Sequence, residues 1–209
     1  MFSATLIRGQ TTDILVKSDT IVYGSRQCKD CTLILDTVVY KLLSCGLYIG
    51  SNGDIGYRSP EIYNDNFDRR TRYITWVWDA DQSDTVNGGL KEMKYVIDTT
   101  SFRFLSDLYW ADKNHIYGFT PMSDGGTIHL KTTADKQTFV AFSNTEYAKD
   151  KTYVYYHHSI LEGADPKTFQ LIENKEISGL ACDKFHFYQF GERLTDKEIK
   201  EYKLENYKR

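Results

Sequence analysis

The chain has 209 residues, of which 41% are hydrophobic and 14% aromatic, and its formal net charge is −3. That length suits one large domain or two small ones, and the apolar fraction excludes an intrinsically disordered chain. The near balance of 26 basic and 29 acidic residues argues against a nonspecific nucleic-acid binder, because no broad basic field is available for a phosphate backbone. Abundant tyrosine and phenylalanine, with only three prolines, favour a fold built mainly of strands.

The N-terminal residues indicate where the protein resides. No window of the sequence is apolar for long enough to span a bilayer. The first eight residues, from Met1 to Arg8, lack the charged start and the apolar stretch of a secretory signal. We therefore expect a cytoplasmic protein, or a periplasmic or surface protein if a leader has been removed.

Residues 1–95 are predicted to form a β-rich region of short strands. Asn52-Gly53 favours a tight hairpin turn, and residues 72–78 alternate as one long strand would. We place a boundary near residue 95, so that residues 96–209 form a second region or continue the same domain. The other predicted strands are Ile14–Val16, Ile21–Tyr23, Thr32–Leu35 and Thr37–Tyr40.

Cys28 and Cys31 form a Cys-x-x-Cys motif. A structural zinc site normally needs two such pairs, and here no second pair exists, although Cys45 could join with a histidine. A redox dithiol needs a helix beginning at the motif, whereas Thr32–Leu35 is predicted as a strand. We expect free, reduced cysteines, with no metal and no cofactor.

The densest aromatic and acidic segment, here called the acidic patch, comprises Trp76, Trp78, Asp79, Asp81 and Asp84. It is read as a solvated hairpin loop, as a protein-binding surface or as a calcium loop. The calcium reading lacks the glycine and the terminal glutamate of an EF-hand. As a candidate site, the patch is our predicted interface with a partner.

The second region repeats two short phrases three times. An Asp-Lys pair precedes a Tyr by five residues in each copy, and a Ser/Thr-Phe pair stands upstream. The Asp-Lys pairs are 38 and 33 residues apart, which indicates one supersecondary unit used several times. We predict turn-forming Asp residues and equivalent, buried Phe anchors. The repeated residues are Phe102, Asp112, Lys113 and Tyr117; Phe139, Asp150, Lys151 and Tyr155; and Phe169, Asp183, Lys184 and Tyr188.

The C-terminus carries the one strong helix signal. Thr195 and Glu198 form a capping box, and Leu194 with Ile199 occupy the positions of a hydrophobic staple. The pattern predicts a helix from Asp196 to about Tyr207. The predicted fold class is therefore mainly β, with antiparallel sheets built from repeated hairpin units and one C-terminal helix.

No catalytic motif appears in the sequence. It has no nucleophile elbow, no phosphate-binding loop and no His-Glu-x-x-His. His157 and His158 are expected on opposite faces of a strand, which is poor geometry for one site. A dyad of Cys182 with a nearby histidine stays open. We expect that the protein is not an enzyme.

The repeated phrases resemble those of the bacterial DKNYY family. The middle copy matches best, with residues 149–156 followed by Gly163-Ala164-Asp165-Pro166 and the Lys-Thr-Phe that ends at Phe169. The first copy departs by having Gly118 in place of the second tyrosine. The resemblance covers about residues 98–190 and implies a β-rich repeat, with no catalytic residues to carry over. Residues 188–202 are also similar to the end of laminin-G-like jelly-roll lectin domains.

These features lead to an expected function. A leaderless, mildly acidic and aromatic-rich β scaffold suits a noncatalytic protein-binding protein, specifically a bacterial immunity protein that neutralises a cognate toxin by covering its active site. A carbohydrate-binding or cell-envelope β-sandwich module is the alternative, and an enzyme with an unrecognised site is the third reading.

Overall fold

The fold is built almost entirely of antiparallel strands. The computed structural model describes residues 18–27, 32–58, 73–79, 89–122, 125–174 and 176–207. Within these ranges the strands form four sheets, accompanied by two short helices. The predicted fold class, mainly β with repeated hairpin units and a C-terminal helix, is confirmed.

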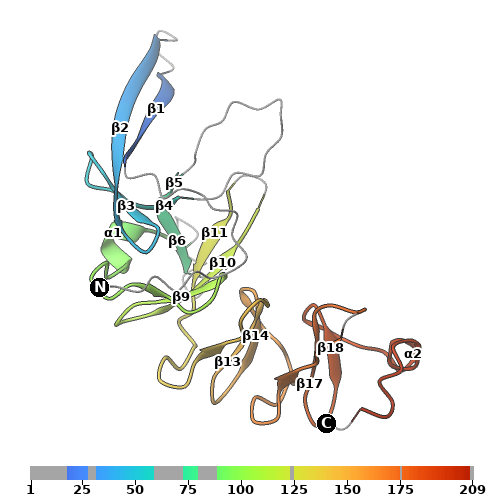
Figure 1. The fold of residues 1–209 in the computed structure, drawn as a ribbon. Helices are drawn as coiled ribbons and strands as arrows, with labels where there is room; N and C mark the ends of the chain where they lie inside the picture. Colours follow the sequence, from blue (N-terminus) through green and yellow to red (C-terminus); the bar gives the residue numbers. More distant parts are fainter. Residues whose placement is uncertain are drawn as a thin grey trace, which may run out of the picture.

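The first sheet is a meander of five antiparallel strands. Its first two strands form a long hairpin that projects from the rest of the molecule (Figure 1). The predicted Asn-Gly turn is present, with Gly53 at a φ of +83° and Asn52 donating to Asp54 at 2.8 Å. The strands are β1 (Ser18–Gln27), β2 (Thr32–Ser44), β3 (Leu47–Gly50), β4 (Ile55–Arg58) and β5 (Tyr73–Ile74).

Two strand predictions are wrong. Residues 32–35 and 37–40 belong to one strand, β2, because Asp36 continues the ladder opposite Tyr23. Residues 72–78 were predicted as one strand, but its described part divides between β5 and β6 (Trp76–Asp79), and Arg72 lies outside the described residues. The break falls at Thr75, whose carbonyl accepts the N–H of Met93 at 2.8 Å where the chain passes to the second sheet. The predicted strand at residues 14–16 lies outside the described residues.

The second sheet joins the two halves of the chain. Its six strands run in the order β7-β6-β11-β10-β9-β8, and only β6 and β11 pair in parallel. Since β6 and β7 precede residue 95 and β8–β11 follow it, the boundary expected there runs through a sheet. The new elements are β7 (Leu90–Glu92), α1 (Met93–Val96), β8 (Arg103–Phe104), β9 (Tyr109–Ala111), β10 (Ile116–Thr120) and β11 (Thr127–Leu130).

The largest hydrophobic core holds the first two sheets together. Trp110 of β9 is fully buried at its centre, with ring centroids 4.4 Å from Tyr57 of β4 and 5.4 Å from Phe119 of β10. Leu47 and Val77 belong to the same cluster. Burial of aromatic rings at this scale is the main stabilising contribution here, and it fixes the start of the repeat region against the N-terminal strands.

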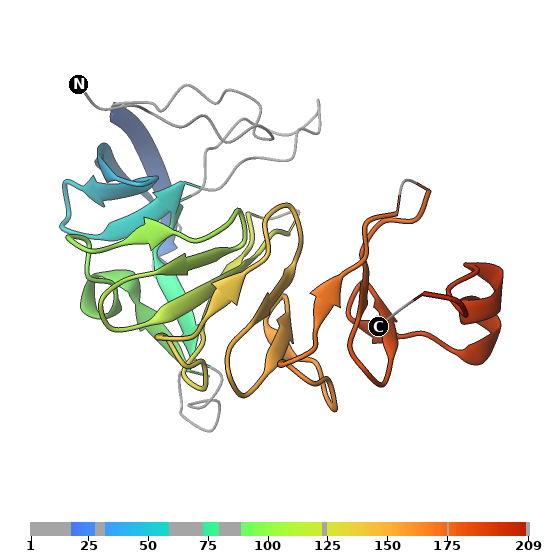
Figure 2. The same ribbon diagram turned by 60° about the horizontal axis from the view of Figure 1, so that its bottom comes forward.

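The third and fourth sheets are four-stranded meanders that repeat the pattern of β8–β11. We call the three copies unit 1 (residues 98–131), unit 2 (135–161) and unit 3 (165–194). The units follow one another in a row, from green and yellow through orange to red in Figure 2. The strands are β12 (Val140–Ala141), β13 (Tyr147–Lys149), β14 (Val154–Tyr156), β15 (Ser159–Ile160), β16 (Gln170–Leu171), β17 (Leu180–Cys182), β18 (Phe187–Gln189) and β19 (Glu192–Arg193).

Helix α2 (Asp196–Glu201) begins as predicted and ends early. Both bonds of the capping box between Thr195 and Glu198 are present. The helix stops because Lys203 takes a left-handed φ of +55°. The N–H of Lys203 donates to the carbonyl of Lys200, and the N–H of Leu204 donates to the carbonyl of Ile199. This pattern is a Schellman stop made without glycine. The prediction of a helix to Tyr207 is therefore wrong.

Candidate functional site at the junctions between repeat units

The Asp of each Asp-Lys pair is the centre of a closed hydrogen-bond network. In unit 2, Oδ1 of Asp150 accepts the N–H groups of Thr152 and Tyr153 at 2.6 and 2.7 Å. Its Oδ2 accepts the N–H of Asp135 and the hydroxyl of Tyr155, both at 2.8 Å. The same four bonds recur around Asp112 and around Asp183.

These networks occupy the carboxylates fully. Burial raises the pKa of Asp150, but the backbone N–H donors and the Tyr155 hydroxyl outweigh it and hold the pKa below its ordinary value. Only 4% of the surface of Asp150 is exposed to solvent. A buried carboxylate with four donors tightens a turn and has no lone pair free for proton transfer, so these Asp residues act as structural centres.

The Lys of each pair closes the turn on its outer side. The N–H of Lys151 donates to Oγ1 of Thr138 at 3.0 Å, and its ammonium lies 2.5 Å from the carboxylate of Asp135. The equivalent ion pairs are Lys113–Asp98 and Lys184–Asp165. All three lysines are exposed, so each ion pair contributes little to stability.

The three Phe residues make one equivalent contact but are not equally buried. Each ring lies about 6 Å from the repeated Tyr of its own unit, at 6.1, 5.6 and 5.9 Å between centroids in units 1, 2 and 3. Phe102 and Phe169 are buried, whereas Phe139 is partly exposed. The prediction of a buried Phe139 is wrong: its ring packs against Tyr109, Ala148 and Tyr155 but stays partly exposed.

A tyrosine at the start of the second strand docks each unit onto the next. The Tyr109 hydroxyl of unit 1 lies 2.8 and 2.9 Å from the carbonyls of Glu146 and His157 in unit 2. The Tyr147 hydroxyl of unit 2 donates to the carbonyl of Gly179 and accepts the N–H of Gly191 in unit 3. Both rings also contact the Phe of the next unit.

Unit 3 docks onto the C-terminal helix instead. Leu180 stands where the docking tyrosines stand in the other units, and it packs with Leu194 and Leu204. The Tyr202 hydroxyl donates to Oε1 of Gln189 at 3.0 Å. The predicted staple partners Leu194 and Ile199 belong to this same cluster. Helix α2 therefore covers the end of the row of units.

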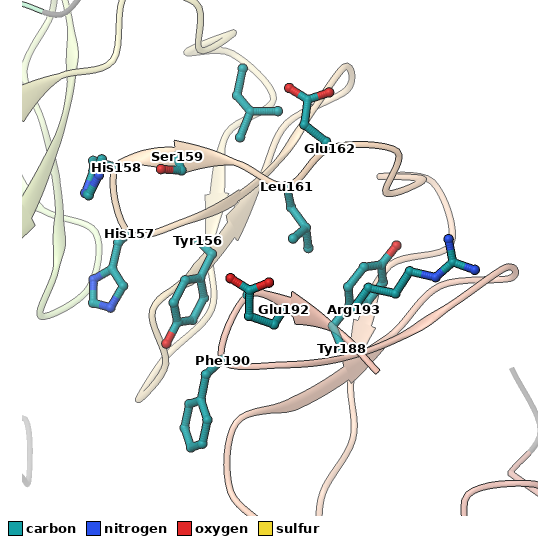
Figure 3. Close-up of a pocket in the computed structure, with 12 residues that line it drawn as sticks. Tyr156, His157, His158, Ser159, Leu161, Glu162, Tyr188, Phe190, Glu192 and Arg193 are labelled. Atoms are coloured by element: carbon teal, nitrogen blue, oxygen red, sulfur yellow. The ribbon is translucent and has the colours of Figure 1, made fainter. Parts of the chain in front are cut away.

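A groove of about 420 Å³ lies between unit 2 and unit 3 (Figure 3). The turn His157–His158 forms one wall and the turn Phe190–Gly191 the other. The ring of Tyr156 stands between them, and charged side chains gather at the rim (Figure 3). The rim residues are Glu162, Glu192 and Arg193, all exposed.

The groove depends on glycine at two turn positions. Gly191 has a φ of +80°, and a Cβ added there would lie 2.4 Å from the ring of Tyr156. Gly179 has a φ of +72°, and a Cβ there would lie 2.5 Å from the ring of Phe190. Tyr156 of unit 2 therefore rests directly on the backbone of Gly191 in unit 3, and this contact brings the two units together, whereas Phe190 rests on Gly179 within unit 3.

The histidine prediction needs correction. His157 and His158 do not lie in a strand; they are the two loop residues of the hairpin between β14 and β15. His157 has a φ of +49°, and its ring packs against Tyr156 at 4.6 Å. The chain returns after this turn as β15, so the turn places both imidazoles beside the groove.

The acidic patch is only partly described. Trp76 is 46% exposed on β6, and Trp78, two residues on, is partly buried. Asp79 is 3% exposed, and its carboxylate accepts from Lys91 at 2.6 Å, so its expected place in an exposed loop is wrong. Asp81 and Asp84 lie outside the described residues, as do Cys28 and Cys31.

The docking tyrosines have a sequence signal that lies just outside the repeated phrases. Tyr109 and Tyr147 each stand three residues before the Asp of the Asp-Lys pair. The groove has no comparable signal, because its walls come from two units. In the part of the chain that the structure describes, no three or more His, Cys, Asp or Glu side chains gather to hold a metal ion. Among the same residues no helix meets the length and hydropathy needed to cross a membrane.

Comparison with known proteins gives a family match and nothing closer. The family model described as DKNYY family matches residues 89–208, which is more than half of the chain. No curated protein matches the chain. No solved structure matches it either.

Proposed function

This chain belongs to the DKNYY family, and we propose that it works by binding another protein along the groove between units 2 and 3. The groove itself is the observation that supports this proposal. It offers a recess of about 420 Å³ between two rigid turns, with aromatic side chains inside and charges at the rim. Buried aromatic anchors surrounded by polar side chains are the usual centre of a protein–protein interface.

The side chains in the groove have the chemistry of interface hot spots. Phe190 is 49% exposed, and Tyr156 is partly exposed with its ring held by Gly191. A ring that is already fixed loses little conformational freedom when a partner covers it. Arg193 adds a planar cation, and Glu162 and Glu192 add carboxylates that select a partner of complementary charge.

Within this class we propose an immunity protein, whose partner is a toxin enzyme neutralised by coverage of its active site. One feature supports the choice: the exposed carboxylates of Glu162 and Glu192 suit a basic enzyme cleft. We expect an interface of standard size, roughly 1,200–2,000 Å² in total. Asp79 is not part of the proposed contact, because it is buried and paired with Lys91.

Affinity capture from the source cells tests the proposal. Wild-type protein should retain a partner that the Glu162→Lys, Glu192→Lys double variant binds roughly tenfold more weakly, because charge complementarity across the rim is reversed. The matched control reverses Glu173 and Glu205, two exposed glutamates that do not line the groove. Equal capture by both double variants would remove the groove from the binding surface. A captured partner whose toxicity this protein leaves unchanged would contradict the immunity role.

A carbohydrate-binding module is the second candidate. One observation favours it: aromatic rings and carboxylates line the same recess, and sugar rings stack on aromatic faces while their hydroxyls bond carboxylates. A glycan-binding screen distinguishes the two candidates. Retention of a defined glycan, lost on Phe190→Ala, together with no captured protein, would replace protein binding by carbohydrate binding.

A further inference from the structure

Lys131 is a buried lysine whose ammonium group has no hydrogen-bond partner. It follows β11 in unit 1, and only 7% of the residue is exposed. Its ammonium nitrogen makes no hydrogen bond and lies 5.2 Å from the ring centroid of Tyr155 in unit 2. Burial lowers the pKa of Lys131 to about 7. Burying an amine without a partner destabilises a fold, so its presence at the junction needs a reason.

Other lysines of the units do have partners. Lys149 of unit 2 donates to the carbonyl of Phe169 at 2.8 Å, and Lys151 pairs with Asp135. Lys131 differs because the residue that its side chain packs against, Gly118, has no side chain of its own. Gly118, at the position of Tyr156 in unit 2, is where the first repeat departs from the double tyrosine. A Cβ at Gly118 would lie 3.1 Å from Cε of Lys131, so the lysine stem occupies space that the glycine leaves.

Three histidines lie close enough to this amine for its charge to lower their pKa, and the backbone of one of them, His157, lies 3.7 Å from the same Cβ position at Gly118 that the Lys131 stem approaches. His129 pairs with Gly118 across the β10–β11 ladder, and its ring stacks on His158 of unit 2 at 4.8 Å. Nδ1 of His157 is buried and has no hydrogen-bond partner. Unit 1 and unit 2 thus each contribute an unpartnered buried nitrogen to one junction.

The charges at the junction are unbalanced. Burial is the main cause that lowers the pKa of His158, and the positive charge of Lys131 lowers it further. Burial and the charge of Lys131 also lower the pKa of His129 and of His157. The burial of His129 takes its pKa to about 4. Glu146 is the one carboxylate that acts on this group, and it opposes the lowering only at His157.

We propose that the junction of units 1 and 2 binds a carboxylate group, with Nζ of Lys131 and Nδ1 of His157 as its donors. An ionised carboxylate is an acceptor with two oxygens, which matches two buried donors that lack acceptors. It also supplies the negative charge that the amine and the imidazoles need. His158 is exposed and lines the groove, so it marks the side from which the carboxylate reaches Lys131.

The carboxylate can come from an acidic side chain of a protein or from a free organic acid, and the chemistry at Lys131 is the same. The site stands independently of the proposed function, because it needs only this group. Binding charges the amine, so the protein takes up a proton from solution at a pH above 7. The surrounding groups that titrate or carry charge are His129, His157, His158, Glu146, Tyr109 and Tyr155.

Titration with sodium acetate tests the site, with sodium chloride at equal ionic strength as the reference. Calorimetry at pH 8 in two buffers of different ionisation enthalpy should show proton uptake, and NMR should show shifts at the Lys131 amine and the His157 ring. Lys131→Met should weaken acetate binding roughly tenfold or more and abolish the proton uptake. Lys149→Met is the matched control, since Lys149 already has a partner, and it should bind acetate as wild type does.

Further outcomes decide the identity of the ligand. If Lys131→Met fails to fold, His157→Gly takes its place, because glycine adopts the left-handed backbone at this position and removes the second donor, and it should also weaken acetate binding. A glutamate-rich peptide that binds more tightly than acetate identifies a protein-borne carboxylate, and equal affinity identifies a free acid. Absence of proton uptake, equal acetate binding by Lys131→Met, or binding of inorganic phosphate without acetate would each overturn the proposal.

Discussion

The two junctions between repeat units use the same anchor for different surfaces. In both, a tyrosine hydroxyl from one unit bonds the backbone of the next, and its ring contacts the next phenylalanine. The position one residue after the repeated tyrosine then differs. Tyr156 covers glycine and forms a groove, whereas Gly118 leaves space for an unpartnered lysine. Repeat scaffolds of this kind keep the docking contact constant and place their chemistry at the neighbouring positions.

The largest expected effect compares the phenylalanines at the two junctions. Phe169→Ala should lower the free energy of unfolding by about 3–5 kcal/mol, because the ring is buried against Tyr147 and Tyr188. Phe139→Ala should lower it by roughly half as much, since that ring is partly exposed. Urea denaturation of both variants measures the difference. Equal losses would mean that the two junctions are packed alike.

Next in size is the effect of adding a methyl group at the two glycines. Gly191→Ala should destabilise the protein by about 2–4 kcal/mol, because it combines a left-handed backbone with a clash against Tyr156. Gly118→Ala should change stability by less than about 1 kcal/mol, since the flexible end of Lys131 can move. Thermal melting of the two variants provides the measurement. A Gly191→Ala variant as stable as wild type would contradict the tight contact.

A smaller effect separates the two docking hydroxyls. Tyr147→Phe should destabilise the protein by about 1–3 kcal/mol, because the N–H of Gly191 loses its acceptor. Tyr109→Phe should cost less, since the carbonyl of Glu146 keeps the N–H of His157 as a donor. Amide hydrogen exchange at Gly191 and at His157 in the two variants reports each junction separately. Slow exchange at Gly191 in Tyr147→Phe is the contradicting result.

A further difference between the two junctions is a slope of stability with pH. The pKa of Lys131 is lowered in the folded state to about 7, so above that pH the unfolded chain binds more protons at this residue. The free energy of unfolding should therefore rise from pH 7 towards pH 9 more steeply in wild type than in Lys131→Met. The stability that wild type loses by burying this amine should be greatest below pH 7, where the amine is charged in the folded state. Chemical denaturation at a series of pH values gives both curves. Parallel curves would show that Lys131 titrates as an exposed lysine does.

Local signals in the sequence predicted local structure well. The capping box at Thr195 and Glu198, the turn at Asn52-Gly53 and the three Asp-Lys turns all depend on residues a few positions apart. The family match at residues 89–208 agrees with the repeat that those phrases define. Each of these features follows from hydrogen bonds that one short segment makes with itself.

Features that join distant segments escaped prediction. The parallel pair β6–β11 brings Val77 beside Ile128, and no local pattern marks this pairing. The sequence pattern predicted Asp79 in an exposed loop, whereas its carboxylate pairs with Lys91 on the neighbouring strand. The groove and the junction at Lys131 likewise need side chains from two units, so the sequence revealed the repeat without revealing where its units meet.

Replacement of the docking tyrosine by Leu180 in unit 3 has a consequence for how long the row can become. A unit with a tyrosine three residues before its Asp-Lys pair can bind the backbone of a following unit through that hydroxyl. In unit 3, Leu180, Ile172 and Cys182 instead form one apolar cluster with residues of α2 and of the segment after it. This packing buries them within the same molecule. Stacked sheets with an uncovered end would add further copies and polymerise. The segment from Ile199 to Leu204 therefore occupies the face of unit 3 on which a further unit would dock.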